Sequence, residues 1–304
     1  MTVKKGEPSL KWHPSLKKVF KESALWWQSN MVNRNELETR IAKLRAELDA
    51  PGPLRSAATT LHAIGHTYAI QACVSAGEGD LELLPSAVRS AVDFRALDFR
   101  RISGLSLPHP EQPVLPFWWS MKAAGPAMLS QWELTATCGR VLIDIAEKDL
   151  RVKPLEFYPD GWRRGTNDAF LIALFSQAFG IQSSFEPGRP LADEYRAVLD
   201  VWRSDDEVRF QAAMHAAAEF HISRSRDGTN KTTYEFEAYF DRVFPGELLA
   251  VQALRRRLSL PAFDSGHLLV DTPWSLIRDL PATASNPLIV ETESRLQHDY
   301  PSFR

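Results

Sequence analysis

Residues 35–48 read Asn-Glu-Leu-Glu-Thr-Arg-Ile-Ala-Lys-Leu-Arg-Ala-Glu-Leu, and they give the clearest structural signal in the chain. Four apolar residues recur every three or four positions, which is the period of an amphipathic α-helix: Leu37, Ile41, Leu44 and Leu48. Asn35 is predicted to cap the helix, and Glu38 is predicted to close a capping box. Pro51-Gly52-Pro53 then ends it.

The same helical period recurs along most of the chain, and strand-like alternation almost nowhere persists. Further helices are predicted over 14–29, 57–76, 81–101, 117–124, 127–147, 167–179 and 191–202, and from near 204 and 245. Gly125-Pro126 is predicted to separate two of them. We therefore expect an all-α fold, an irregular bundle of about ten to twelve helices. Its segment 261–304, which contains several prolines, is expected to be less regular.

The stretch 103–116 is predicted to be a connection on the surface. It holds four prolines, which remove too many amide donors for a regular element: Pro108, Pro110, Pro113 and Pro116. We expect residues 1–304 to form a single domain, or two lobes of 1–102 and 117–304 that this connection joins.

Composition narrows the function classes. Hydrophobic residues make up 44% and charged residues 24%, so most of the chain is expected to fold. A net charge of −2 argues against a nucleic-acid partner, which needs concentrated Lys and Arg. Cys73 and Cys138 lie in apolar helical patterns, which is typical of free thiols in a reducing compartment. The sequence near Met1 lacks the apolar stretch of a secretory signal, and no long apolar run follows. The protein is therefore expected in the cytoplasm, without a membrane partner.

His62 and His66 form an H-x3-H pair, a helical spacing that can place two imidazoles on one metal ion. The glutamate of the zinc-protease signature is absent, and Cys73 is too far along the helix to join both histidines. Asp205-Asp206 offers a second candidate, for magnesium, although acids in a first helical turn are favoured by the helix dipole alone. We expect neither a metal nor another cofactor, and treat His62 and His66 as weak candidates.

The sequence contains no catalytic signature, neither a phosphate-binding loop nor a G-x-S-x-G elbow. His221 lies on an apolar helical stripe, and His267 lies in an irregular segment. Histidines in such positions more often satisfy local hydrogen bonds than act as bases. No catalytic residue is therefore predicted, and the chain is not expected to be an enzyme.

Adjacent tryptophans point to a binding surface. Neighbours on a helix lie about 100° apart, so the pairs Trp26-Trp27 and Trp118-Trp119 cannot each be buried on one face. Exposed Trp and Arg are enriched at binding hot spots. The predicted partner contacts are Trp26, Trp118, Trp119, Arg255 and Arg256.

The segment 195–274 has a recognisable order of motifs: Phe220-His221, then Phe244-Pro245-Gly246-Glu247-Leu248-Leu249-Ala250, Leu254, Leu260 and His267-Leu268-Leu269. It resembles the all-α immunity proteins of bacterial polymorphic-toxin systems, most nearly the immunity protein 49 family. Residues 132–149 and 162–180 also look like the central helices of that family. The resemblance covers about half of the chain, and its positions are mostly apolar. It implies neutralisation of a cognate toxin by stoichiometric binding, without turnover or cofactor.

Two other classes stay open. One is a metal-dependent enzyme with a site in the helical bundle, which bound metal in the purified protein would indicate. The other is a regulatory or ligand-sensing helical scaffold, which a large internal apolar pocket would indicate.

Overall fold

The computed structural model describes residues 10–32, 34–54, 57–109, 116–151, 165–229, 232, 234–281 and 286–304. These residues contain thirteen α-helices and no strand, which confirms the predicted all-α bundle. The first six helices are α1 (Lys17–Trp27), α2 (Glu36–Asp49), α3 (Ala57–Glu78), α4 (Leu84–Leu105), α5 (Pro116–Met128) and α6 (Trp132–Arg151). The others are α7 (Asn167–Phe179), α8 (Asp193–Val201), α9 (Glu207–Ser223), α10 (Tyr239–Val243), α11 (Gly246–Arg257), α12 (Leu268–Ile277) and α13 (Pro287–Asp299).

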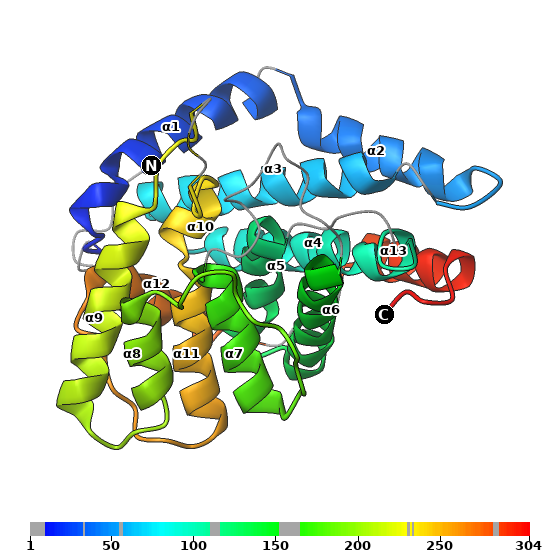
Figure 1. Ribbon diagram of the computed structural model, residues 1–304. Helices are drawn as coiled ribbons and strands as arrows, with labels where there is room; N and C mark the ends of the chain where they lie inside the picture. Colours follow the sequence, from blue (N-terminus) through cyan, green and yellow to red (C-terminus); the bar gives the residue numbers. More distant parts are fainter. Residues whose placement is uncertain are drawn as a thin grey trace, which may run out of the picture.

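Helix α4 is enclosed by its neighbouring helices. In Figure 1, α1 and α2 lie on the outer side of α3, and α7, α8, α9 and α11 stand next to one another on the opposite side of the molecule. Helix α3 makes its most extensive contact with α4, and α4 also contacts α5, α6 and α13. Residues 91–100 of α4 are consequently buried on every face of the helix.

Helix α4 carries four charged side chains through this buried stretch. Asp93 and Arg100 are at most 9% exposed, and so are Arg95 and Asp98. A buried charge is tolerated when it is paired and hydrogen-bonded, and Arg100 accordingly donates to Glu293 of α13 at 2.6 Å. The partners of Arg95 and Asp98 lie at the candidate site described below.

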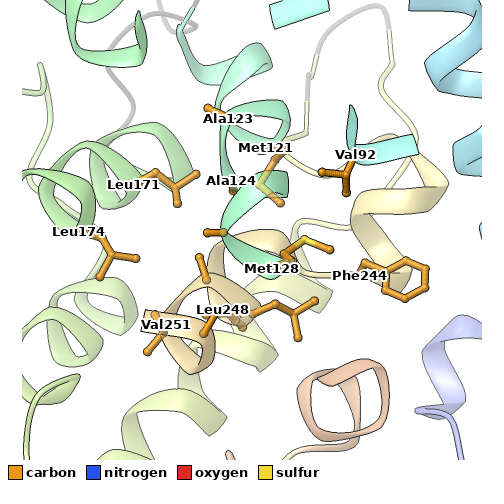
Figure 2. Close-up of a cluster of buried hydrophobic side chains, with 14 of the residues drawn as sticks. Val92, Met121, Ala123, Ala124, Met128, Leu171, Leu174, Phe244, Leu248 and Val251 are labelled. Atoms are coloured by element: carbon orange, nitrogen blue, oxygen red, sulfur yellow. The ribbon is translucent and has the colours of Figure 1, made fainter. Parts of the chain in front are cut away.

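The larger hydrophobic core is centred on α5, α7 and α11. Figure 2 shows Met121, Ala124 and Met128 of α5 facing Leu248 and other apolar residues of α11. The first residue of α11 is a glycine, and a Cβ atom there would lie 3.2 Å from the sulfur of Met128. Because this residue has no side chain, α11 can approach α5 closely. Each leucine that is fully buried in this core stabilises the folded protein by about 2 kcal/mol.

A second core cluster joins segments that are distant in sequence. It contains apolar residues of α2, α3, α4 and α13: Leu44, Leu48, Leu61, Ile64, Phe94, Leu97, Leu288, Ile289 and Leu296, among others. The larger cluster also includes residues from both sides of the predicted connection 103–116. Of that connection, residues 103–105 still belong to α4, and residues 110–115 lie outside the described residues.

Helix α2 exists where the sequence predicts it, but its predicted capping box is wrong. Asn35 has a φ of 49°, and its side chain donates to Glu38 instead of accepting a backbone amide. The backbone amide of Asn35 is bonded to Met31 O at 3.0 Å. The chain therefore enters α2 from a preceding helical turn, Gln28–Val32, and not from the extended conformation that a capping residue usually adopts.

The predicted break at Gly125-Pro126 is also wrong. Helix α5 continues through Pro126 to Met128, and the chain turns at Ser130, whose φ is 58°. A proline inside a helix loses one hydrogen bond. The complete burial of Ala127 and the near-complete burial of Met128 against the core offset that loss.

The C-terminal segment 261–304 is more regular than expected. It contains α12, which continues through Pro273, and α13, which begins at Pro287. Pro287 stands in the first helical turn, where its missing N–H is not needed. None of the described helices combines the length and the apolar composition that are needed to cross a bilayer.

Candidate functional site

A cavity of about 370 Å³ opens where α3, α5 and α10 meet. Figure 1 shows the short helix α10 beside α3, with which it is in contact. Rings make up much of its lining: His62, His66, Trp119, Tyr234, Tyr239 and Phe240. The site thus gathers both histidines of the H-x3-H pair and one of the predicted tryptophan contacts.

Arg95 reaches the cavity because α3 and α4 cross closely at Gly65. A Cβ atom on Gly65 would lie 3.2 Å from Cγ of Arg95. The Arg95 side chain is 10% exposed, and its Nη2 donates to Oδ1 of Asp241 at 2.6 Å. Its guanidinium also lies 4.8 Å from the ring centre of Phe240. Helices α4 and α10 are thereby joined by an ion pair at the edge of the cavity.

Asp98 organises a second group of charges beside the cavity. Its fully buried carboxylate accepts from Lys122 Nζ at 2.6 Å and from Arg101 Nε at 2.9 Å, and it lies 3.5 Å from His62 Nδ1. Burial alone would raise the pKa of this carboxyl, but the hydrogen bond from His62 and the two cations hold it well below its usual range. Asp98 is therefore a permanent anion that fixes Lys122 next to the ring of Trp119, 4.0 Å from its centre.

The histidine pair is arranged unlike a metal site. The rings of His62 and His66 are stacked with centres 6.4 Å apart. The Lys122 ammonium lies 3.2 Å from His62 Nδ1 and 2.6 Å from Asp98, so a resident cation already contacts both this imidazole and the nearest carboxylate. Within the described residues, no metal-ligand cluster of three side chains includes either histidine.

Lowering the pH is expected to destabilise the protein through His66. Burial, and then the positive charges of His62 and Arg95, lower the pKa of His66 to about 4 from 6.5. Between these values the unfolded state binds a proton that the folded state does not, so stability is lost as the pH falls from 6.5 to 4. The expected loss is about 2–3 kcal/mol at pH 4.5. Urea unfolding at pH 7 and pH 4.5 measures it.

The variant His66→Phe is the control for that prediction, because it removes the titrating group and keeps a ring beside the cavity. Its loss of stability between pH 7 and pH 4.5 should be smaller than that of the unaltered protein by about 2 kcal/mol. Equal losses in the two proteins would contradict the prediction.

The other predicted partner contacts are distributed differently. Trp26 of α1 is half-buried, and its ring packs perpendicular to that of His66 with centres 5.4 Å apart, so it lies beside the cavity. The side chain of Trp118 lies outside the described residues. Arg256 is exposed on α11, away from the cavity, where it pairs with Asp279 at 2.9 Å.

The prediction that Arg255 contacts a partner is corrected by its burial, since this residue is 2% exposed. Its Nη1 donates to the carbonyl oxygens of Trp202 at 2.7 Å and Ser204 at 3.0 Å. Its Nη2 donates to that of Pro261 at 2.8 Å. Two adjoining rings contact the guanidinium: those of Phe210 and Phe263. Arg255 therefore holds the loop after α8 and the loop after α11 together.

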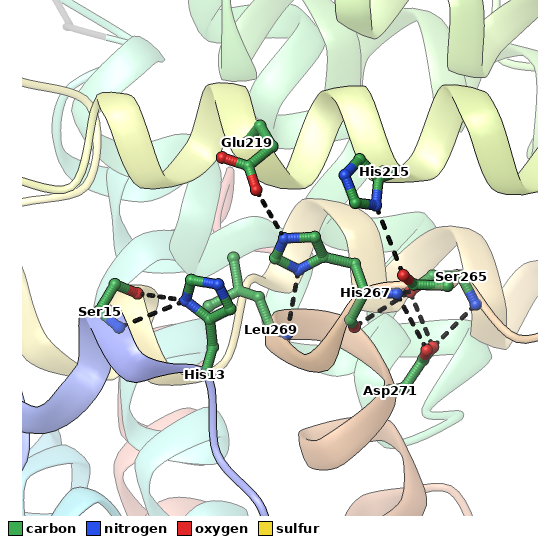
Figure 3. A network of polar contacts seen from close by, with 9 residues as sticks. His13, Ser15, His215, Glu219, Ser265, His267, Leu269 and Asp271 are labelled. Atoms are coloured by element: carbon green, nitrogen blue, oxygen red, sulfur yellow. Dashed lines mark hydrogen bonds and ion pairs between the residues drawn. The ribbon is translucent and has the colours of Figure 1, made fainter.

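A second polar cluster, shown in Figure 3, brings His13, Glu219 and His267 within metal-ligand distance of one another. His267 Nε2 lies 3.0 Å from the Glu219 carboxylate, and His267 Nδ1 accepts the amide of Leu269 at 3.1 Å. His13 Nδ1 accepts the amide of Ser15 in the same way, at 3.3 Å. Both histidines therefore cap helices through Nδ1.

These caps oppose metal binding at the cluster. A neutral imidazole carries one N–H and one acceptor nitrogen, so a ring that accepts at Nδ1 keeps its proton at Nε2. A metal ion on Nε2 of His267 would move that proton to Nδ1, facing the N–H of Leu269. The hydrogen bond from His267 Nε2 lowers the pKa of Glu219. The cluster is best described as a carboxylate that receives an imidazole N–H.

The remaining candidate residues have structural partners. Asp206 caps α9 by accepting the amide of Arg209 at 3.1 Å, as an acid at a helix N-terminus does. His221 is fully buried, and its Nδ1 lies 2.6 Å from Glu247 Oε1, which also accepts from the Tyr195 hydroxyl at 3.2 Å. This pair lies in the core, away from the lining of the cavity.

The two thiols are expected to be unreactive in the folded protein. Cys73 and Cys138 are completely buried, and burial raises the pKa of Cys138 to about 12 and that of Cys73 further. Because the thiolate is the reactive form, a disulfide reagent such as Ellman's should label neither thiol at pH 8 within minutes. In denaturant the same reagent should report both thiols of the chain. Rapid labelling of the native protein would contradict the burial.

Sequence reasoning missed Arg95, Asp98, Lys122 and Asp241, which supply the charges of the site. The sequence of residues 91–100 does indicate buried charges, because charged and apolar residues are so closely mixed there that a helix would have no purely polar face. Such a helix, buried all round, must bring its charges to partners. Which partners these are depends on how the helices cross, and the crossing is not visible in one sequence.

The chain was compared with protein-family models, with curated proteins and with solved structures, and none of the three comparisons found a match.

Proposed function

We propose that this chain is a binding protein that neutralises a bacterial toxin by forming a stoichiometric complex with it in the cytoplasm. The observation that carries the proposal is a group of aromatic side chains from three helices: His66 of α3 and Trp119 of α5 line the cavity, and Trp26 of α1 packs against His66 beside it. Half-buried rings around a pocket are typical of binding hot spots. A toxin is proposed as the partner because the motif order of residues 195–274 resembles that of immunity proteins.

The state of the charges supports binding over turnover. Arg95 is paired with Asp241 at 2.6 Å, and Asp98 is shared by Lys122 and Arg101. A general base or nucleophile needs a group that is free to change its bonding during a reaction. The paired charges instead hold the neighbouring aromatic rings in one position. A partner that binds to these rings therefore loses less binding free energy to ordering their side chains.

The experiment that tests the proposal is co-purification of the tagged protein from a bacterial host that carries the neighbouring genes. The expected result is a single protein at one-to-one stoichiometry, whose toxicity in cells is suppressed by this chain. Recovery of the chain with no partner, together with no protection of cells that express the neighbouring gene, would overturn the proposal.

The binding surface is then mapped with two variants. Trp119→Ala should weaken the complex at least about tenfold, as truncation of a hot-spot ring does. Val208→Ala is the control, because Val208 is 76% exposed on α9 and is not part of the cavity lining. If both variants bind as the unaltered protein does, the partner uses another face, of which the exposed Arg256 is the next candidate.

The cavity also favours a second function, a ligand-sensing helical scaffold. Its volume of about 370 Å³ falls in the range of small-molecule pockets, about 300–1,000 Å³, and its lining combines aromatic and apolar side chains with charged ones that could orient a ligand. Extraction of the denatured protein, followed by mass spectrometry of the released compounds, tests this function. A stoichiometric small molecule would support it.

A further inference from the structure

Arg95 is a buried arginine with few partners. Its side chain is 10% exposed, yet among the described residues it makes one hydrogen bond, from Nη2 to Asp241. A guanidinium carries five N–H donors. The buried Arg255, by contrast, donates to three carbonyl oxygens. Because Arg95 lines the cavity, its other N–H groups are available to an acceptor that enters there.

The charges around the cavity leave a positive surplus on the wall that α3, α4 and α5 form. Asp98 is one carboxylate between two cations, Lys122 and Arg101. On the opposite wall, Glu235 is neutralised by Arg224, whose Nε lies 2.5 Å from it. Asp241 is matched by Arg95 itself. Counted with the partners that lie behind the lining, these groups are four cations and three carboxylates, which leaves one positive charge in excess.

One more acid, Glu237, belongs to the lining, but it is exposed and accepts the amide of Tyr234 at 3.1 Å. Its charge is therefore screened by water. The low pKa of His66, to which the charges of Arg95, Arg40 and Lys122 contribute after burial and His62, agrees with a positive potential inside the cavity. An anion is favoured there over a cation.

The apolar part of the lining suits a flat group. Ile70 is almost fully buried at the cavity wall, and the rings of Trp119 and Tyr239 are half-buried beside it. One face of Trp119 is occupied by Lys122. Aromatic rings pack in offset or edge-to-face arrangements with other rings, so an aromatic group matches this lining.

We propose that the cavity binds a carboxylate carried on an aromatic group, with N–H groups of Arg95 donating to the carboxylate and the aromatic group lying against Trp119. The planar guanidinium can donate two parallel hydrogen bonds to a carboxylate, which a lysine cannot do. The carboxylate belongs either to a free small molecule or to an acidic side chain of a protein partner. This inference rests on the cavity alone and not on the identity of a toxin.

Pairs of probes that differ only in charge test the proposal on the unaltered protein. Indole-3-acetate represents a free ligand, and acetyl-Trp-Glu-amide represents an acidic side chain. Their neutral counterparts are indole-3-acetamide and acetyl-Trp-Gln-amide. Calorimetric titration at pH 7 should show at least one acid binding about tenfold or more tightly than its neutral counterpart, since a hydrogen bond to a charged group is worth about 1.5–3 kcal/mol. The pair that shows the preference identifies the source of the carboxylate.

Two variants connect that preference to Arg95. Asp241→Asn removes the carboxylate that competes for the guanidinium, so the acid probe should bind several-fold more tightly. The double variant Arg95→Met, Asp241→Leu removes the ion pair as a unit and leaves no unpaired buried charge. It should bind the acid and the neutral probe equally. Circular dichroism and thermal unfolding establish that both variants keep their helices.

Three results would overturn the proposal: equal affinity of acid and neutral probes for the unaltered protein, no binding of any probe at millimolar concentration, or an unchanged preference in the double variant. None of these results bears on toxin binding, which the co-purification measures separately. A protein that captures its partner but ignores the carboxylates would keep the proposed function and lose this site.

Discussion

Replacing Arg255 with alanine is expected to lower the free energy of unfolding by about 4 kcal/mol, more than any exposed substitution in the chain. The side chain is 2% exposed and donates to the carbonyl oxygens of Trp202, Ser204 and Pro261. Alanine would leave these acceptors, one buried and two partly buried, without their donor, at about 1–3 kcal/mol for each that water does not reach. It would also remove a cation that contacts two aromatic rings, worth roughly another 1–2 kcal/mol.

Urea-induced unfolding followed by circular dichroism measures this effect, and the neighbouring residue provides the control. Arg256 has the same chemistry but is exposed and pairs with the exposed Asp279. Arg256→Ala should therefore change the free energy of unfolding by no more than about 1 kcal/mol. If the two alanine variants lose the same stability, the buried carbonyl contacts of Arg255 contribute nothing, and the prediction fails.

The second large effect is expected at Asp98. Asp98→Asn keeps the shape of the side chain but removes the negative charge between Lys122 and Arg101, whose side chains are 12% and 15% exposed. Removing one member of a buried ion pair usually costs about 3–5 kcal/mol, because the remaining charge has lost its partner. We expect about 3 kcal/mol here, since Lys122 keeps His62 and the ring of Trp119 as neighbours.

The matched control for Asp98→Asn is Asp279→Asn. Asp279 also receives hydrogen bonds from two arginines, but its side chain is 66% exposed, so the substitution should cost less than about 1 kcal/mol. Chemical unfolding of both variants at pH 7 gives the comparison. The same variants titrated with the carboxylate probes would show whether Lys122, once released from Asp98, alters the charge of the cavity.

The existence of the helices could be predicted far better than their ends. The periodic residues of α2 placed that helix correctly, because a repeat of four large apolar residues leaves no other regular structure. Its cap could not be predicted, since the left-handed φ of Asn35 depends on the helical turn before it. The helix break predicted at Pro126 was wrong because tertiary packing also decides where this helix ends. A proline usually ends a helix, but here the buried residues that follow it hold the helix together.

The candidate site was predictable only in its aromatic half. His62 and His66 stood out by their spacing, and Trp26 and Trp119 by their neighbours, but nothing in the sequence placed the four together. The Arg255-Arg256-Arg257 run shows the limit most clearly. Three identical residues differ in role because α11 turns by about 100° per residue, which buries Arg255 and leaves Arg256 in solvent.

The all-round burial of α4 has a consequence for synthesis on the ribosome. Helix α13, which covers part of α4 through Leu288 and Leu296, follows it by about 180 residues along the chain. Since the ribosome adds about 5–20 residues per second, α13 is synthesised roughly 10–40 s after α4. We expect the charges of Asp93 and Arg100 to stay in contact with water during this interval; in the folded protein both are buried. They are expected to protect the unfinished chain from aggregation until its last helices emerge.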